Sequence, residues 1–437
     1  MLTGERKRWT VWLGRGAFAV TDQGLMSGSN FVLSILLARW LSPEQYGAYA
    51  LAFSMFFFVS AVHQALVLEP MSVLGTAEYS TRPREYGGAM LWFQAAFSIL
   101  LAVVFGAAAL LARAMGQMNF SAALLGLALG APGILLFWLA RMTCYVNCSP
   151  ATAACGAAVY SAALFSGAGL LWYTHRLSVV TVFVLMGAAA CLTAAVLLLR
   201  FRPDPRCGRV LLREAAKSHW RYGRWALGSS LVIWVPGNIF YSITSAILGL
   251  GSAGAFRALM NLSYPVTHTC NALSLLVQPQ LSGAAARSGG RSTLRGVAAI
   301  GGLYAAGALF WLAVIALGSG RLWRLLYGNH FHSSSGLAVW ILVGVVFQVA
   351  AYAPAVGLRA LQAPALVFGA YSIAAVACLA VGIPATQRWG LPGAVASWAG
   401  ALLLSFLATL ALYLRRARSP REGHAPDMEP MLSMEAG

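Results

Sequence analysis

The sequence predicts an all-α polytopic membrane protein, with about twelve transmembrane helices in two six-helix lobes around a central cavity. Composition is the first observation behind this prediction. Of the 437 residues, 59% are hydrophobic and only 10% are charged, whereas an ordinary soluble domain carries about 25% charged residues. The mean hydropathy is +0.72. With so few ionised groups the chain cannot cover its surface in water, so lipid is the expected solvent for most of it.

The spacing of long apolar segments is the second observation. A helix that crosses a bilayer needs about 20 predominantly apolar residues. Six such segments lie near residues 17–41, 45–68, 88–112, 120–146, 151–174 and 178–199. Six more lie near 225–249, 252–281, 297–318, 335–358, 363–386 and 391–414. The connections between them are short, which leaves no room for a soluble domain.

The segments divide the chain into two lobes and three polar pieces. The predicted organisation is a cytoplasmic N-terminus over 1–16, an N-terminal lobe over 17–199, a basic cytoplasmic linker over 200–224, a C-terminal lobe over 225–414 and a tail over 415–437. The linker is weakly amphipathic from Val210 to Trp220, so we expect it at the membrane surface. The tail has no periodicity, and we expect it to be disordered.

The net charge of +18 has a topological explanation. If the N-terminus is cytoplasmic and the sides alternate, cytoplasmic segments hold 23 of the 30 Lys and Arg residues, and the outer ends hold 7. Positive residues accumulate on the cytoplasmic side of membrane proteins. The asymmetry predicts a multi-pass protein of the bacterial inner membrane with both termini in the cytoplasm, and it removes the argument for nucleic acid as a partner.

The two halves share short sequence matches. Residues 46–51 open the second segment and residues 253–258 open the eighth with a similar pattern around Gly47 and Gly254. Arg141 ends the fourth segment, and Arg359 ends the tenth. Repeats of six helices are parallel and enclose a cavity that can open to either side. Chance similarity between apolar helices is the alternative.

Polar residues recur at helical spacing in the second half, where lipid-facing helices would have none. The stripes comprise Ser230, Trp234, Asn238, Tyr241 and Ser245; Arg257, Asn261, Tyr264, His268 and Asn271; and Gln348, Tyr352, Arg359 and Gln362. Each of these helices also holds an internal proline, Pro236, Pro265 or Pro354, which leaves a backbone carbonyl without its helical partner. A helix that lines a cavity tolerates such a carbonyl better than one that faces lipid. The pattern predicts a hydrated cavity; interhelical hydrogen bonding alone is the alternative.

Asp22 is the only acid clearly within a predicted span, so it is the candidate ion-coupling residue, with H⁺ or Na⁺ as the ion. Alternatively, Asp22 only accepts hydrogen bonds from neighbours or lies in interfacial water. Arg39 is expected to reach the outer interface, while the sequence leaves open whether Arg39 and Arg141 face the cavity.

Enzyme and cofactor signatures are missing from the sequence. It contains no Gly-x-x-x-x-Gly-Lys-Ser/Thr phosphate loop, no Gly-x-Ser-x-Gly and no His-Glu-x-x-His. The seven cysteines show neither a pairing pattern nor the spacing of a metal site. We therefore expect no enzymatic activity, no catalytic residues, no cofactor and no metal.

Several stretches resemble Wzx-type polysaccharide flippases of the multidrug/oligosaccharidyl-lipid/polysaccharide (MOP) superfamily. They lie in helices 1–2 and 7–8: Asp22–Phe31, Leu37–Tyr49, Gln64–Met71, and Ala253–Leu262 with Pro265 and Pro279–Leu281. The resemblance implies two six-helix lobes facing a cationic cavity. It also implies transport of a polyprenyl-diphosphate-linked oligosaccharide to the outer leaflet, with polysaccharide polymerases and glycosyltransferases as further partners.

On this resemblance, Arg257 and Arg359 are the candidate ligands of the substrate diphosphate, because guanidinium matches phosphate geometry. Asn261, His268, Asn238 and Tyr352 would face the sugars. A multidrug exporter driven by Na⁺ or H⁺ is the alternative, although an arginine-lined cavity would repel cationic drugs. A membrane-embedded polysaccharide polymerase is a third interpretation, but this sequence lacks the large outer loop in which such an enzyme would place its catalytic residues.

Overall fold

The computed structural model describes residues 2–75, 78–328 and 330–419, and the elements of these residues are helical. The N-terminal lobe contains α1 (Leu2–Trp40), α2 (Pro43–His63), the π-helix η1 (Gln64–Leu68), α3 (Glu69–Leu74), α4 (Pro83–Ala114), α5 (Met118–Val146), α6 (Pro150–Tyr173) and α7 (Val179–Phe201). The C-terminal lobe contains α8 (Arg209–Leu248), α9 (Leu250–Asn261), α10 (Tyr264–Ser288), η2 (Gly290–Ser292), α11 (Thr293–Tyr327), η3 (His332–Leu337), α12 (Ala338–Ala360) and α13 (Pro364–Arg418).

These helices confirm a polytopic membrane fold. Nine helical stretches of the described chain are long and apolar enough to cross a membrane by length and composition. Neither α1 nor the pair α9–α10 is among the nine, and α13 counts once although it turns back at Gly390 with φ of 64°. With these included, the chain makes about twelve passes, as the sequence predicts.

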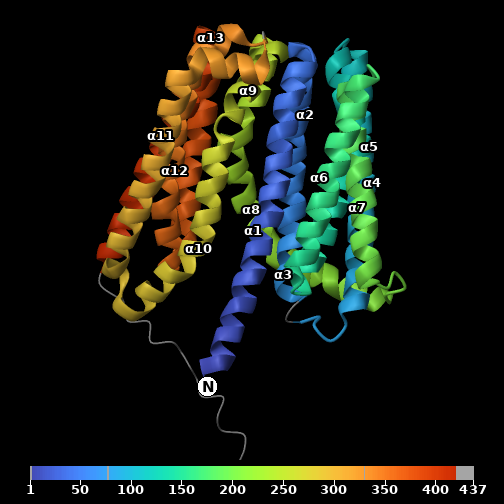
Figure 1. Ribbon diagram of the computed structural model, residues 1–437, viewed down its shortest axis with the longest axis vertical. Helices are drawn as coiled ribbons and strands as arrows, with labels where there is room; N and C mark the ends of the chain where they lie inside the picture. Colours follow the sequence, from blue (N-terminus) through green and yellow to red (C-terminus); the bar gives the residue numbers. More distant parts are fainter. Residues whose placement is uncertain (1, 76–77, 329, 420–437) are drawn as a thin grey trace, which may run out of the picture.

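Two helical groups flank a central set (Figure 1). In the N-terminal lobe α5 packs on α4 and α7, and in the C-terminal lobe α12 packs on α11 and α13. The lobes meet where α2 packs against α8 and α9. The N-terminus lies at the lower end in Figure 1. The chain therefore forms two bundles joined along the middle, the arrangement that a central cavity requires.

The linker differs from its predicted form. Residues 209–224 are the first turns of α8, which runs unbroken into the seventh span. They pack on the N-terminal lobe: His219 Nδ1 lies 2.9 Å from the Leu66 carbonyl, and its Nε2 lies 2.7 Å from the Tyr86 hydroxyl. A Cβ on Gly223 would lie 2.6 Å from the Ala65 carbonyl. The amphipathic face of the linker thus covers protein.

Other boundaries also shift. Helix α1 begins at Leu2, well before the predicted start at residue 17. The predicted eighth span, 252–281, is interrupted after Asn261, and a second helix begins at Tyr264, because Pro265 cannot continue the first helix's hydrogen bonds. Helix α13 extends to Arg418, and the remainder of the predicted tail, 420–437, lies outside the described residues.

Candidate functional site

A cavity of about 840 Å³ lies between the two lobes. Its wall comes from α1, α2, η1, α5, α8, α9, α10 and α12, so both lobes contribute. The polar lining side chains are Gln23, Ser27, Asn30, Ser60, Gln64, Arg141, Tyr145, Ser230, Asn238, Arg257, Tyr264, His268 and Gln348. Phe31, Phe53, Phe57, Trp138 and Trp234 supply aromatic rings. A cavity is therefore present where the polar stripes predict one, and the N-terminal lobe lines it as well.

Arg257 is the buried cation of this cavity. Its side chain is only 2% exposed, and its guanidinium carbon lies 5.3–5.7 Å from the ring centroids of Phe53, Tyr241 and Tyr264. Its nitrogens donate long hydrogen bonds, of 3.4 Å to the Ser34 hydroxyl and 3.5 Å to the Tyr241 hydroxyl. Aromatic faces attract a cation but do not neutralise it.

Among the residues that the structure describes, no carboxylate pairs with this guanidinium. Residues 215–421 contain neither Asp nor Glu. In the described part of the N-terminal lobe, Asp22 pairs with Arg141 instead. A buried unpaired charge is costly because the protein interior solvates it poorly. An anion bound in the cavity beside Arg257 would supply the missing counter-charge.

A polar knot of Ser34, Tyr46 and Asn261 closes the lobes next to Arg257. The Ser34 hydroxyl donates to Asn261 Oδ1 at 3.1 Å and lies 2.9 Å from the Tyr46 hydroxyl, and Asn261 Nδ2 donates to Tyr46 at 3.0 Å. All three side chains are buried. In this conformation the Asn261 amide, predicted to face the sugars, forms hydrogen bonds between helices and does not line the cavity.

Two glycines bring the lobes into backbone contact beside this knot. A Cβ on Gly254 would lie 2.7 Å from the Pro43 carbonyl oxygen and 3.1 Å from the Gly47 nitrogen. A Cβ on Gly47 would overlap the Leu250 carbonyl. These are the matched glycines of the internal repeat, so corresponding positions of the two lobes touch each other. The cavity is sealed at this end.

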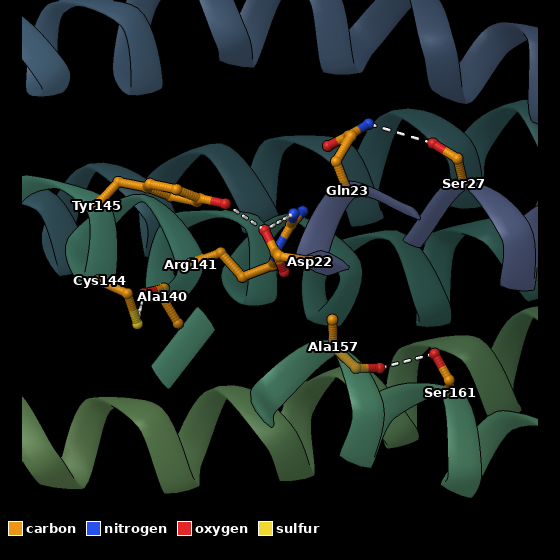
Figure 2. A network of polar contacts seen from close by, with 9 residues as sticks. All are labelled: Asp22, Gln23, Ser27, Ala140, Arg141, Cys144, Tyr145, Ala157 and Ser161. Atoms are coloured by element: carbon orange, nitrogen blue, oxygen red, sulfur yellow. Dashed lines mark hydrogen bonds and ion pairs between the residues drawn. The ribbon is translucent and has the colours of Figure 1, made fainter. Parts of the chain in front are cut away.

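Asp22 lies in the opposite half of the cavity, at its wall. Figure 2 shows its carboxylate between Arg141 and Tyr145 of α5. Arg141 Nε donates to Oδ1 at 3.1 Å, its Nη2 makes a second, shorter bond to Oδ2, and the Tyr145 hydroxyl donates to Oδ2 at 2.6 Å. Asp22 is fully buried, while Arg141 and Tyr145 line the cavity. The pair therefore presents the arginine, not the acid, to the cavity.

The remaining predicted residues divide between two places. Asn238 and His268 line the central cavity with Arg257. Arg359 and Tyr352 line a second, smaller cavity within the C-terminal lobe, so the two predicted diphosphate ligands do not share one chamber. Arg39 is exposed and donates to the Leu325 carbonyl at 3.2 Å, outside the cavity lining.

The sequence did not indicate the π-helix η1. It lies between α2 and α3, and its first and last residues, Gln64 and Leu68, face the cavity. Such wide turns occur frequently at functional sites. Beside it, His63 Nε2 lies 2.7 Å from Gln94 Oε1, while His63 Nδ1 is buried without a partner. Arg141 was visible in the internal repeat, but only its pairing with Asp22 reveals its orientation.

Comparison with known proteins agrees with this geometry. The family model described as polysaccharide biosynthesis protein matches residues 36–335, more than half of the chain. The chain therefore belongs to this polysaccharide biosynthesis protein family. No curated protein sequence matches the chain significantly.

Solved structures share its fold at low identity. An inward-facing multidrug resistance MATE family transporter of the MOP superfamily is 14% identical with a TM-score of 0.76, covering 91% of this chain and 98% of that one. An outward-facing structure of a MATE family transporter scores 0.64 at 14% identity, covering 92% and 96%. The lipid II flippase MurJ, in an inward closed conformation, scores 0.70 at 11% identity, covering 92% and 90%.

The chain thus belongs to a polysaccharide biosynthesis protein family and has the fold of MOP-superfamily transporters, which agrees with the resemblance to Wzx-type proteins. The structural neighbours described above are a MATE family transporter and a lipid II flippase. Among the residues that the structure describes, no cluster of three or more His, Cys, Asp or Glu side chains could hold a metal ion.

Proposed function

We propose that this protein moves a polyprenyl-diphosphate-linked oligosaccharide from the inner to the outer leaflet of the bacterial inner membrane by alternating access. The observation that carries the proposal is Arg257, a 2% exposed cation at the sealed end of the cavity, within residues 215–421, which contain no acid. A diphosphate supplies the missing negative charge. Aromatic and amide groups of the same wall suit sugar faces and hydroxyls.

The shape of the cavity supports entry from one side. The lobes are in backbone contact at Gly47 and Gly254, near the beginnings of α2 and α9, whereas the cavity wall extends to Leu68 and Tyr145, at the ends of η1 and α5 away from that contact. If the N-terminus is cytoplasmic, as the charge asymmetry predicts, the open end faces the cytoplasm. The conformation is then the one that accepts substrate from the inner leaflet.

The ion pair of Asp22 and Arg141 supports a coupling mechanism. A diphosphate that enters the cavity competes with Asp22 for Arg141, because both are oxyanions that accept paired guanidinium bonds. If the diphosphate takes Arg141, Asp22 becomes a buried carboxylate without its cation. Such a group is costly unless it takes up H⁺ or Na⁺. Substrate movement and ion uptake would then be linked at one residue.

A multidrug exporter driven by Na⁺ or H⁺ is the second candidate, favoured by the MATE-like fold. The cavity charge argues against it. Arg141 is neutralised by Asp22 and Arg257 is not, so the lining carries net positive charge. Cationic drugs would be repelled. Drug resistance conferred by expression of the protein, without any effect on surface polysaccharide, would favour this candidate over the flippase.

The decisive test is complementation of a strain that cannot export its surface glycan. Each charge-assisted hydrogen bond contributes about 1.5–3 kcal/mol, so Arg257→Ala should weaken diphosphate binding about ten- to hundredfold. Arg257→Lys keeps the positive charge but loses the paired hydrogen bonds of the guanidinium, and it should retain part of the transport activity. Arg388→Ala is the matched control, since Arg388 is exposed and absent from the cavity lining. Full complementation by Arg257→Ala at normal expression would contradict the assignment.

A further inference from the structure

A second cavity of about 250 Å³ lies inside the C-terminal lobe, between α8, α9, α10, α12 and α13. It shares Ile233, Gly237 and Gln348 with the central cavity, so the two adjoin at these residues. We call it the side chamber. It contains Arg359 and Tyr352, the predicted substrate residues that the central cavity does not include.

The side chamber contains polar groups that the protein itself leaves unsatisfied. The hydroxyl of Ser405, a residue only 2% exposed, has no hydrogen-bond partner, and neither does the buried Gln348 Oε1. Both residues line the chamber. Arg359 also lines it, and residues 215–421 offer no carboxylate to pair with it. Buried polar groups are normally bonded, so Ser405 and Gln348 indicate a ligand with hydroxyl groups. Arg359 is exposed at the wall and has no ion-pair partner among the described residues, so its guanidinium can bind a negatively charged group of the same ligand.

The volume of the side chamber and its aromatic side chains restrict the choice of ligand further. A water molecule occupies about 30 Å³ in the liquid, so a single monatomic ion would leave most of the chamber unfilled. Tyr352, Tyr371 and Trp398 contribute aromatic rings. The Trp398 indole nitrogen already donates to the Pro236 carbonyl at 3.1 Å, so its ring offers the chamber an apolar surface. One carbon-rich pyranose face fits this environment.

We propose that the side chamber binds one acidic monosaccharide unit, with its carboxylate at Arg359 and its hydroxyls at Gln348 and Ser405. The proposal rests on the proposed function, because the chamber adjoins the cavity that would take the lipid-linked glycan. It extends that function by assigning a negatively charged sugar to the substrate. The same chemistry could come from a free sugar acid or from a residue of the glycan.

The test uses the full chain in lipid nanodiscs and saturation-transfer NMR with glucuronate, glucose and a polyprenyl diphosphate carrying either sugar. Wild type should bind glucuronate at least tenfold more tightly than glucose. Arg359→Gln and Ser405→Val should each weaken glucuronate binding at least tenfold, whereas Arg388→Gln should not. If the preference for glucuronate, and its loss in the two variants, are seen only with the lipid-linked sugars, the proposal holds, and the bound acidic sugar is a residue of the glycan.

Three outcomes overturn the proposal. In the first, glucuronate and glucose bind equally tightly, both as free sugars and as lipid-linked sugars. In the second, the preference for glucuronate survives in Arg359→Gln. In the third, replacing the buffer anion by chloride at constant ionic strength abolishes the preference. Binding of the polyprenyl diphosphate without sugar separates the two proposals. A variant that keeps this binding is folded, so a failed glucuronate preference then refutes only the side chamber. If the wild-type protein does not bind the polyprenyl diphosphate, the flippase proposal itself is refuted.

Discussion

The glycine contact between the lobes gives a prediction whose size follows from the structure. In Gly254→Ala the added Cβ would lie 2.7 Å from the Pro43 carbonyl oxygen, and in Gly47→Ala it would overlap the Leu250 carbonyl. Both obstacles are backbone atoms of the other lobe, so no side chain can rotate away. Overpacking of this kind costs about 1–3 kcal/mol. The cost applies only when this end is closed, so the open population should rise about 5- to 150-fold.

Spin labels at Met115 and Arg321, which are exposed beyond this end in the two lobes, would report the change in a cysteine-free background. Double electron–electron resonance should show a longer-distance population in Gly254→Ala and a larger one in Gly47→Ala. Gly106→Ala is the matched control, because it gives the same gain in helix propensity where a Cβ meets no atom within 4 Å. Unchanged distances in both variants would refute the closed-end assignment.

Three further predictions follow from other parts of the structure. Asp22→Asn should remove the dependence of glycan transport on pH or on the Na⁺ gradient; transport assays in vesicles that keep the wild-type dependence would exclude a coupling role. Cysteines introduced at positions 210 and 420 should react only with reagents that enter the cytoplasm, and labelling from the periplasm at either one would contradict the topology. Burial lowers the pKa of His219 below its usual value; the folded state then favours the neutral ring, so stability present above about pH 6.5 is lost as the pH falls. Thermal unfolding of His219→Gln should therefore change less between pH 8 and pH 5 than that of wild type, and equal changes would show that His219 does not contribute.

The sequence by itself determined the solvent, the number of passes and the two-lobed repeat. Few charged residues and twelve apolar segments leave little choice of fold class, because a chain in lipid must satisfy its backbone hydrogen bonds internally, here as helices. The polar stripes also identified the cavity-lining faces of α8 and α10, since 3.6-residue periodicity places Ser230, Trp234 and Asn238 on one side. These features are local, so they can be predicted from local patterns.

Only the tertiary structure decided which polar residues meet. Asn261 and His268 share one sequence stripe, yet the break between α9 and α10 places Asn261 in the polar knot and leaves His268 in the cavity. Arg257 and Arg359 occupy different chambers, and Asp22 finds Arg141 119 residues away. Periodicity gives the direction of a side chain around its own helix, but partners are fixed by how separate helices pack, which depends on side-chain volumes and backbone contacts across the whole chain.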